Sequence, residues 1–413
     1  MSTLKVNTVL SADTPTVNIT DGLNVTGVGT VANLPATTLT STNLVNATQL
    51  SNRNLVINGA MKVAQYGTSS TSTGYQTVDR FKVTNIQTDE NTTNSQHTLT
   101  SSDTGPYGAG FRKSFHIQNG NQTGGAGTSD RITFNTSLEA QDVANSGWDY
   151  TSSSSYVTLQ FWVRSSVAQN FNFYLMTSDG TAQIYPMVTG TLSANTWTKI
   201  TKSIPGNSNL TFNDDNGTGL TIEWSPFMGT AYTSDSTSND VWAAAGSYDT
   251  RTPDQTSTWY TTNDATFEIT GVQFELGSAA TPFEHRSFGD ELARCQRYFY
   301  MHANGSVDGN GSGGSAICDN ASAYNSDLVF FTVDFPVTMR TKPSLVASNG
   351  SGDYGYYTPG SALTGFQTLS LDGVTTRTVG NINFSVSSAF SGGQSILVRT
   401  KTSDATMAFS AEL

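Results

Sequence analysis

Short runs of alternating apolar and polar residues recur from Asn54 to the C-terminus, with turn residues between them. In the first part of the chain these runs occupy residues 55–57, 81–83, 132–134, 157–163, 171–176, 197–204, 220–224 and 267–276. About eight strands without a long helical pattern predict a large jelly-roll β-sandwich over residues 53–286. Further runs at 328–335, 366–371, 382–386, 396–398 and 407–409 predict a smaller C-terminal β-sandwich over residues 300–413.

One helical pattern separates these two regions. Ser287 and Asp290 resemble a capping box in which Asp replaces the usual Glu. Leu292, Cys295 and Phe299 follow at positions i, i+3 and i+7, so they form one apolar stripe. The pattern predicts a short helix over residues 287–299 that docks one β domain onto the next and buries this stripe between them.

Residues 1–52 contain no aromatic residue, whereas the rest of the chain is rich in them. Residues 17–25 predict a β-hairpin, because a three-residue loop ending at Gly22 places the apolar residues of both strands on one face. A single ribbon is only marginally stable and needs a packing partner. We therefore expect residues 1–52 to form an attachment or oligomerisation segment, in which residues 36–51 serve as a linker.

The composition also favours an all-β protein, and it argues against nucleic-acid and membrane partners. Only 13% of the residues are charged, and an α-rich protein needs many Lys and Glu residues. A net charge of −12 argues against binding a nucleic-acid backbone. Cys295 and Cys318 are too few for a disulfide framework. Because no apolar run is long enough to span a bilayer and the N-terminus lacks the apolar core of a signal peptide, we expect neither membrane insertion nor export by that route.

No catalytic motif, metal site or cofactor site is expected. The four histidines (His97, His116, His285 and His302) are scattered without metal-ligand spacing. Residues 309–314 match a G-x-G-x-x-G pattern, but they follow no strand and open no helix. Asp214 and Asp215 suit a turn, with bound Ca²⁺ as the alternative. Glu223, Glu268 and Glu275 lie on predicted strands, and the pattern alone does not say which of them share a face.

An aromatic stretch over residues 224–260 provides the candidate ligand site. It places large rings among Ser, Thr, Asp and Gly, and the candidate residues are Trp224, Tyr232, Trp242, Trp259 and Tyr260. Sugar rings stack on aromatic faces while their hydroxyls need polar partners, so an exposed, concave arrangement would suit a glycan. The alternative is that these rings fill the rim of the sandwich or a subunit contact.

Three blocks of sequence resemble proteins of tailed-bacteriophage virions. Residues 54–61 (Asn-Leu-Val-Ile-Asn-Gly-Ala-Met) and 78–81 (Val-Asp-Arg-Phe) are similar to the opening of tail-fibre domains. Residues 271–298 resemble the junction at which a jelly roll in such fibres passes into a helix and a terminal domain. Residues 159–164, 196–200 and 272–275 also resemble strands of carbohydrate-binding modules. Where those modules often have an acidic pair, this chain has Thr270 and Gly271, which puts any metal or sugar ligand of those modules in doubt.

The resemblance implies a non-enzymatic fibre protein of a phage virion that recognises a glycan on the host surface. It further implies a homotrimer, attached to other virion proteins through residues 1–52 and released from the host by lysis. Two alternatives stay open: a purely structural capsid or tail decoration protein, and a polysaccharide depolymerase.

Overall fold

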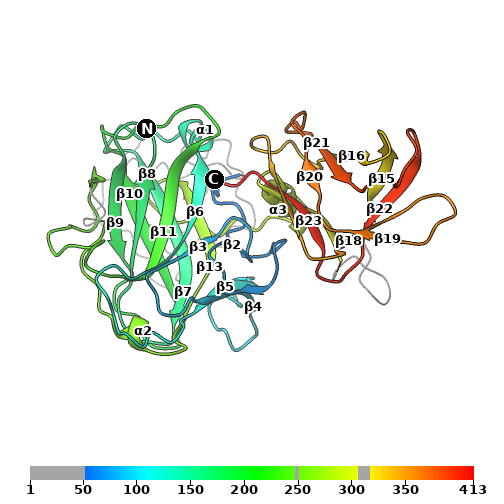
Figure 1. Ribbon diagram of the computed structural model, residues 1–413. Helices are drawn as coiled ribbons and strands as arrows, with labels where there is room; N and C mark the ends of the chain where they lie inside the picture. The colour runs from blue at the N-terminus through cyan, green and yellow to red at the C-terminus, as the bar shows by residue number, and fades with distance from the viewer. Residues whose placement is uncertain (1–51, 247–250, 306–316) are drawn as a thin grey trace, which may run out of the picture. The chain divides into compact units, whose positions relative to one another are not determined.

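The computed structural model describes residues 52–246, 251–305 and 317–413 (Figure 1). All of them belong to one unit of the chain, Thr48–Leu413. The predicted hairpin at residues 17–25, its linker and the loop at residues 309–314 lie outside the described residues. Helices in the described part are short, and none of them has the length and apolar character needed to cross a membrane. The expected all-β architecture is confirmed.

Two antiparallel sheets form the large sandwich (Figure 1). The first has six strands in the order β1-β4-β5-β13-β7-β10, and the second has seven in the order β12-β9-β8-β11-β6-β3-β2. Because successive strands repeatedly change sheet, the connections are those of a jelly roll. The strand bounds are β1 Ser69–Ser70, β2 Gly74–Tyr75, β3 Lys82–Ile86, β4 Thr93–Thr98, β5 Lys113–Gln118, β6 Arg131–Glu139, β7 Tyr156–Ser165, β8 Asn172–Thr177, β9 Gln183–Val188, β10 Thr198–Pro205, β11 Thr218–Met228, β12 Ala243–Ala244 and β13 Thr266–Leu276.

The core of this sandwich follows from the period-2 pattern of its strands. On β7, Val157, Leu159, Phe161 and Val163 are fully buried and point into the core. The intervening residues of this strand therefore point to the outer face of the six-stranded sheet. Two short helices, α1 (Ala140–Ala144) and α2 (Thr258–Thr261), complete the sandwich, and α2 closes one end of it (Figure 1).

The pattern missed some strands and predicted one that is absent. Strands β4, β5 and β9 were not anticipated; β4 (Thr93–Thr98) contains no apolar residue, so it carries no alternation signal. Residues 55–57 form no strand. They run beside β13, but the Asn54 side chain occupies backbone groups of β13 that a paired strand would use. Its Oδ1 accepts a hydrogen bond from Phe274 N, and its Nδ2 donates one to Val272 O.

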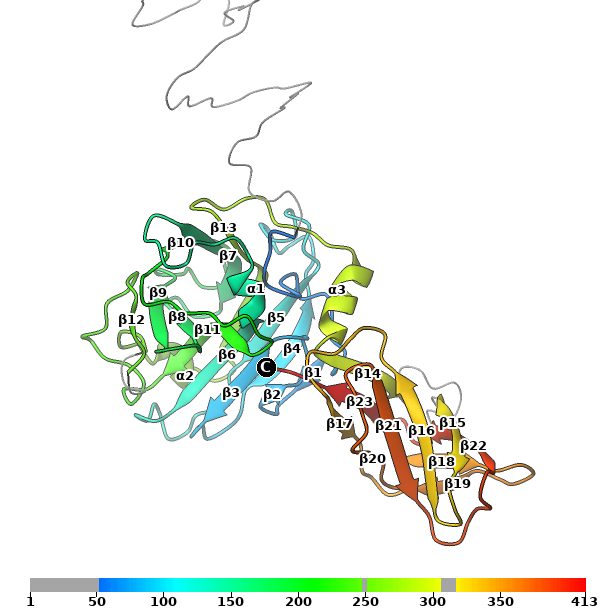
Figure 2. The ribbon, with the colours of Figure 1, turned by 90° about the horizontal axis from the view of Figure 1, so that it is seen from above.

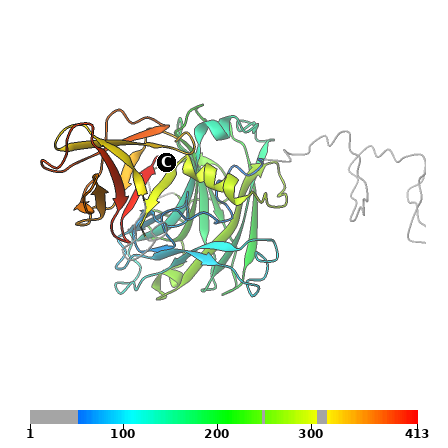
Figure 3. The same cartoon turned by 90° about the vertical axis from the view of Figure 1, so that its right-hand side faces the viewer.

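The predicted helix is present as α3, Phe288–Gln296 (Figure 3). The Ser287 hydroxyl accepts a hydrogen bond from Asp290 N at 3.1 Å and donates one to the Asp290 carboxylate at 2.7 Å, so the expected cap is formed. The helix ends earlier than residue 299, because Phe299 begins strand β14 and pairs with Ser410. Cys295 and Phe299 are buried as expected, whereas Leu292 is only half-buried.

The C-terminal region is a second β-sandwich, as the pattern predicted (Figure 2). Its sheets have the orders β14-β23-β17 and β19-β18-β22-β15-β16-β21-β20. A separate core fills the space between them, with Phe331, Ile382 and Phe409 among its buried residues. The strand bounds are β14 Phe299–Asn304, β15 Ile317–Ala323, β16 Leu328–Asp334, β17 Ser344–Ala347, β18 Tyr354–Tyr357, β19 Thr364–Phe366, β20 Ser370–Leu371, β21 Val379–Ser385, β22 Ser395–Thr400 and β23 Thr406–Ser410.

Candidate functional site

The five aromatic residues predicted to bind a glycan do not form an exposed platform. Trp224, Trp259 and Tyr260 are at most 1% exposed, Trp242 is 9% exposed, and Tyr232 is half-buried. A ring that stacks on a sugar must present a face to solvent. The expectation that the residues 224–260 hold these rings out on a concave surface is therefore wrong for Trp224, Trp259 and Tyr260.

Their contacts show why these rings are buried. Trp224 lies at the centre of the core and stacks on Phe134, with ring centroids 5.4 Å apart. On α2, Trp259 Nε1 donates to Thr266 O and the Tyr260 hydroxyl donates to Asp130, so both rings fill the end of the sandwich. Trp242 Nε1 donates to Pro205 O at 2.7 Å. The alternative stated from the sequence, rings that fill the rim, describes these residues.

A different set of aromatic side chains lies on the outer face of the six-stranded sheet. There a hollow of about 340 Å³ is lined by residues of β7, β10, β13 and two loops. Trp162, Phe283 and Lys199 line it, together with Ala109, Phe111, Gln160, Gly271, Pro282 and His285. Trp197 and Tyr107, like Trp162 and Phe283, are half-buried and pack against the small apolar cluster that contains Phe111. Trp162 faces outward because its neighbours Phe161 and Val163 face the core.

Gly271 shapes the floor of this hollow. It sits in a β-bulge of β13, between Thr270 and Gln273, and has a φ of +65°, which glycine adopts without strain. A Cβ at this position would lie 2.6 Å from the Phe111 ring, so only glycine allows that ring to pack here. The bulge at Gly271 therefore serves the packing of Phe111.

A row of charged side chains crosses the same face. His116 on β5 pairs with Glu268 on β13, and Glu268 pairs with Arg164 on β7. Arg164 donates 2.7 Å hydrogen bonds to both Glu268 and Asp103. Asp103 also accepts from the indole of Trp197 at 3.2 Å, and the Arg164 guanidinium lies over that ring. The charged row therefore fixes the position of Trp197 beside the hollow.

The charges in this row are strongly coupled. Burial raises the pKa of Glu268, but its contacts with His116 and His97 and the charge of Arg164 outweigh burial and hold that pKa well below its usual range. The contact with Glu268 raises the pKa of His97. His97 and His116, expected from the sequence to be scattered, are in fact neighbours, with ring centroids 4.6 Å apart. They come from strands β4 and β5, neither of which the hydrophobic pattern had identified.

The three strand glutamates left open by the sequence do not converge. Glu223 lies on β11 of the seven-stranded sheet, where it accepts hydrogen bonds from Arg131 and Tyr174. Glu268 and Glu275 lie seven positions apart on β13, roughly 20 Å along an extended strand, whereas glycosidase carboxyls lie within about 10 Å. Asp215 accepts from Gly217 N at 2.8 Å, which is a turn contact, and Asp214 accepts from Asn145.

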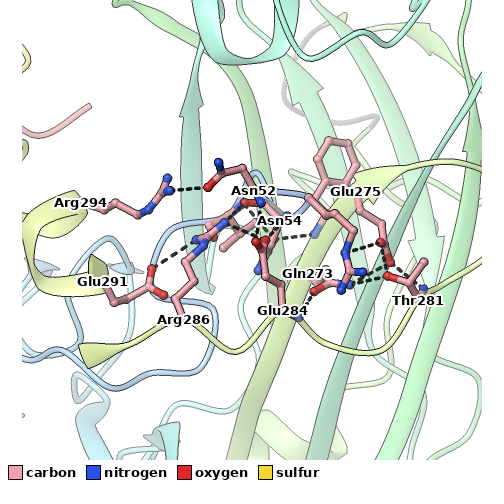
Figure 4. Close-up of polar contacts among 12 residues, drawn as sticks. Asn52, Asn54, Gln273, Glu275, Thr281, Glu284, Arg286, Glu291 and Arg294 are labelled. Atoms are coloured by element: carbon pink, nitrogen blue, oxygen red, sulfur yellow. Dashed lines mark hydrogen bonds and ion pairs between the residues drawn. The ribbon is translucent and has the colours of Figure 1, made fainter. Parts of the chain in front are cut away.

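The blocks that resemble phage fibres contact one another in a polar network (Figure 4). Glu284 accepts from the backbone N of Asn54 at 2.8 Å, and Arg286 donates to the carbonyl of Asn54. Glu291 of α3 accepts from the backbone N of Asn58. These side chains hold residues 52–58 against β13 and α3. The block at residues 271–298 also contributes Gly271, Pro282, Phe283 and His285 to the lining of the hollow.

Comparisons with known proteins identify no family. No family model matches the chain, and no curated protein matches it. Similar solved structures include a domain of tailspike protein 4 from bacteriophage CBA120, with 10% identity over 54% of this chain and 21% of that one, at a TM-score of 0.28. Others are the N-terminal cellulose-binding domain of Cellulomonas fimi β-1,4-glucanase C (9% identity, 53% of this chain and 99% of that one, TM-score 0.26) and a CBM22 tandem domain from Paenibacillus barcinonensis Xyn10C (11%, 80% and 93%, 0.23). This chain spans about a fifth of the tailspike chain. All three TM-scores are below 0.5, and the strand order itself defines the fold of this chain.

Proposed function

We propose that the chain is a non-enzymatic fibre protein of a phage virion and that it binds a glycan of the host surface in the hollow beside Trp162. The observation that carries the binding proposal is a half-buried Trp162 in a concave, mostly apolar hollow with polar side chains at its edge. Such a combination is typical of small-molecule sites, in which apolar walls provide contact area and a few polar groups fix orientation.

The hollow suits one or two sugar residues. Its volume of about 340 Å³ lies at the lower end of the range for ligand pockets. Trp162 and Phe283 supply ring surface, and Lys199 and His285, both exposed, supply polar atoms for hydroxyl groups. Gln160 lines the hollow as well, and its buried Oε1 has no hydrogen-bond donor among the described residues. A shallow site of this kind binds weakly, and several copies in one particle compensate through effective concentration.

The virion assignment is supported by the resemblance of residues 54–61 and 271–298 to phage fibre proteins. In this proposal the chain is a homotrimer, residues 1–52 attach it to other virion proteins, and particles are released by lysis. A Ser- and Thr-rich β surface with little charge fits a protein that must persist outside a cell. The alternative of a decoration protein shares all these features except glycan binding, so the binding experiment separates the two.

The test is binding of the full chain to an array of bacterial surface polysaccharides. We expect Trp162→Ala to lose at least about fivefold in apparent affinity, since a stacking ring contributes about 1 kcal/mol or more. Tyr324→Ala is the matched control, because it removes a ring that is 73% exposed on the C-terminal sandwich. Unfolding curves for both variants show whether they remain folded.

Two results would overturn the proposal. The first is that the folded Trp162→Ala chain binds polysaccharide as well as the wild type. The second is that the wild type binds no polysaccharide at all. Either result would identify the chain as a structural decoration protein. Reducing ends should not accumulate when the chain is incubated with the polysaccharide that it binds. Their release would instead identify a depolymerase.

A further inference from the structure

Three metal-ligating side chains converge on the outer face of the six-stranded sheet. They are His97 on β4, His116 on β5 and Glu268 on β13, and one ligand atom from each lies within 4.8 Å of the others. We propose that these residues bind one divalent transition-metal ion, for which Zn²⁺ is the best chemical match. This site is separate from the proposed glycan site, since none of the three residues lines the hollow.

Two of the distances between ligand atoms are close to those at a tetrahedral ion. His116 Nδ1 lies 3.3 Å from one Glu268 oxygen, and His97 Nδ1 lies 3.5 Å from the other. Two ligands of a tetrahedral Zn²⁺ ion with bonds of about 2.1 Å are separated by roughly 3.4 Å. The His97 side chain is 54% exposed, so its ring has room to rotate toward a bound ion.

The His116 ring is largely buried, and its Nδ1 contacts Glu268 as an ion pair without a hydrogen bond. Its side chain is 13% exposed, and its Nδ1 is buried without a hydrogen bond to any described atom. A buried ring nitrogen without a hydrogen bond costs free energy that a bound ion would recover. The Nδ1 atom and the Glu268 oxygen lie close enough together to share one ion.

Other residues hold the Glu268 carboxylate in place. Arg164 donates to Oε1 at 2.7 Å, and the Ser114 hydroxyl donates to Oε2 at 2.9 Å. Such contacts orient ligands in metal sites and are worth about 10- to 100-fold in affinity. The charges also balance: Arg164 is offset by Asp103, so Glu268 supplies one negative charge toward the ion.

The types of ligand atom indicate which class of metal ion would bind to these three side chains. Two imidazole nitrogens and one carboxylate suit Zn²⁺ and related first-row ions, whereas Mg²⁺ and Ca²⁺ prefer oxygen ligands alone. Water can complete the coordination from the exposed side of His97. The bound ion would connect β4, β5 and β13, and because the unfolded chain lacks this geometry, binding would stabilise the folded state.

The experiment is Zn²⁺ titration of the full, tag-free chain after chelator treatment, with the stoichiometry measured by elemental analysis and the site geometry by visible absorption of bound Co²⁺. We expect one ion per chain and a higher unfolding midpoint in Zn²⁺. His97→Gln should weaken Zn²⁺ binding at least about tenfold. His285→Gln is the matched control, because it removes an exposed histidine elsewhere on this face.

We expect low background binding of Zn²⁺, since the chain has four histidines and both cysteines are buried. Because His97 is exposed, its substitution should leave the fold intact; His116→Gln, verified by its unfolding curve, serves as the second ligand variant. The proposal fails if the wild-type chain binds no Zn²⁺ in the micromolar range. It also fails if His97→Gln and His116→Gln both bind Zn²⁺ as tightly as the His285→Gln control.

Discussion

The ring of Phe299 stacks on the ring of Tyr66, with 3.6 Å between their centroids. Phe299 opens β14 of the C-terminal sandwich, and Tyr66 lies in the segment that leads to β1 of the jelly roll. Beside them, Gln65 Nε2 donates to the carbonyl of Phe299 at 2.8 Å. This stacked pair therefore links the two sandwiches directly, which is the role that the sequence had assigned to the stripe ending at Phe299.

Replacing Phe299 by Ala should destabilise the chain by about 3–5 kcal/mol, because the side chain is 1% exposed and its loss leaves a cavity. Denaturant unfolding measures this change. Phe288→Ala is the control, since that ring is 57% exposed at the start of α3 and its loss should cost little. A loss below about 1 kcal/mol for Phe299→Ala would show that the junction does not depend on this contact.

A buried carboxyl near the same junction predicts a pH effect. Burial raises the pKa of Asp79 to about 7, although hydrogen bonds from Gln65 act in the opposite direction. The unfolded value is about 3.9. Between these two values the folded state binds more protons than the unfolded state, so the contribution of Asp79 to stability is present at low pH and is lost as the pH rises toward 7.

The corresponding measurement compares the free energy of unfolding at pH 5 and pH 8 for the wild type and Asp79→Asn. The wild type should lose more stability over this interval than the variant, which cannot ionise at residue 79. Asp404→Asn, at an exposed position, should keep the wild-type difference. Equal pH differences for the wild type and Asp79→Asn would mean that Asp79 is ionised throughout.

The sequence predicted those elements whose apolar residues alternate and missed those whose stability comes from other sources. Strand β7 was evident because every second residue from Val157 to Val163 enters the core. Strand β4 was missed because its pairing with β5 is satisfied by backbone hydrogen bonds and polar side chains. Residues 55–57 were apolar and yet form no strand, since Asn54 binds the backbone of β13 at that place.

The candidate site was misplaced for a related reason. Aromatic density along the chain pointed to residues 224–260, but density does not distinguish a ring inside the sandwich from one outside it. The two-residue period of a β-strand distinguishes them, because Trp162 and Arg164 must face outward when Phe161 and Val163 face the core. That signal was present in the sequence. The meeting of His97, His116 and Glu268 was not, because it depends on the registers of three strands.

Gly271→Ala should destabilise the chain by about 1–3 kcal/mol, because a positive φ is strained for alanine and the added Cβ would approach Phe111 to 2.6 Å. The variant should also weaken glycan binding, since Phe111 lines the hollow. Gly289→Ala provides the contrast: it lies in α3 with open space around it, so it should be neutral or stabilising by up to about 1 kcal/mol. Similar unfolding curves for the two variants would contradict the described bulge.

Replacement by alanine should affect stability and binding differently for a tryptophan in the core and for one on the surface. Trp259→Ala should cost about 3–5 kcal/mol, because the ring is fully buried, and any loss of binding should follow the loss of folded protein. Trp162→Ala should cost less stability and yet lose binding while it remains folded. Chemical denaturation together with binding to the same polysaccharide separates the two effects. If Trp162→Ala destabilises the chain as much as Trp259→Ala, its ring is part of the packing and the hollow is not a binding site.

The proposed assembly predicts that the N-terminal segment joins chains without being needed to fold the rest. The truncation should remove residues 1–47 rather than 1–52, because Arg294 donates to the side chain of Asn52 (Figure 4). In addition, Arg53 donates to Pro282 O. Both sandwiches have their own cores, so the truncated chain should unfold cooperatively near the wild-type midpoint. Its mass in solution should fall from that of a trimer to that of a monomer. A truncated chain that is still trimeric would place the oligomer contacts in the sandwiches, and one that fails to fold would show that residues 1–47 belong to the folded unit.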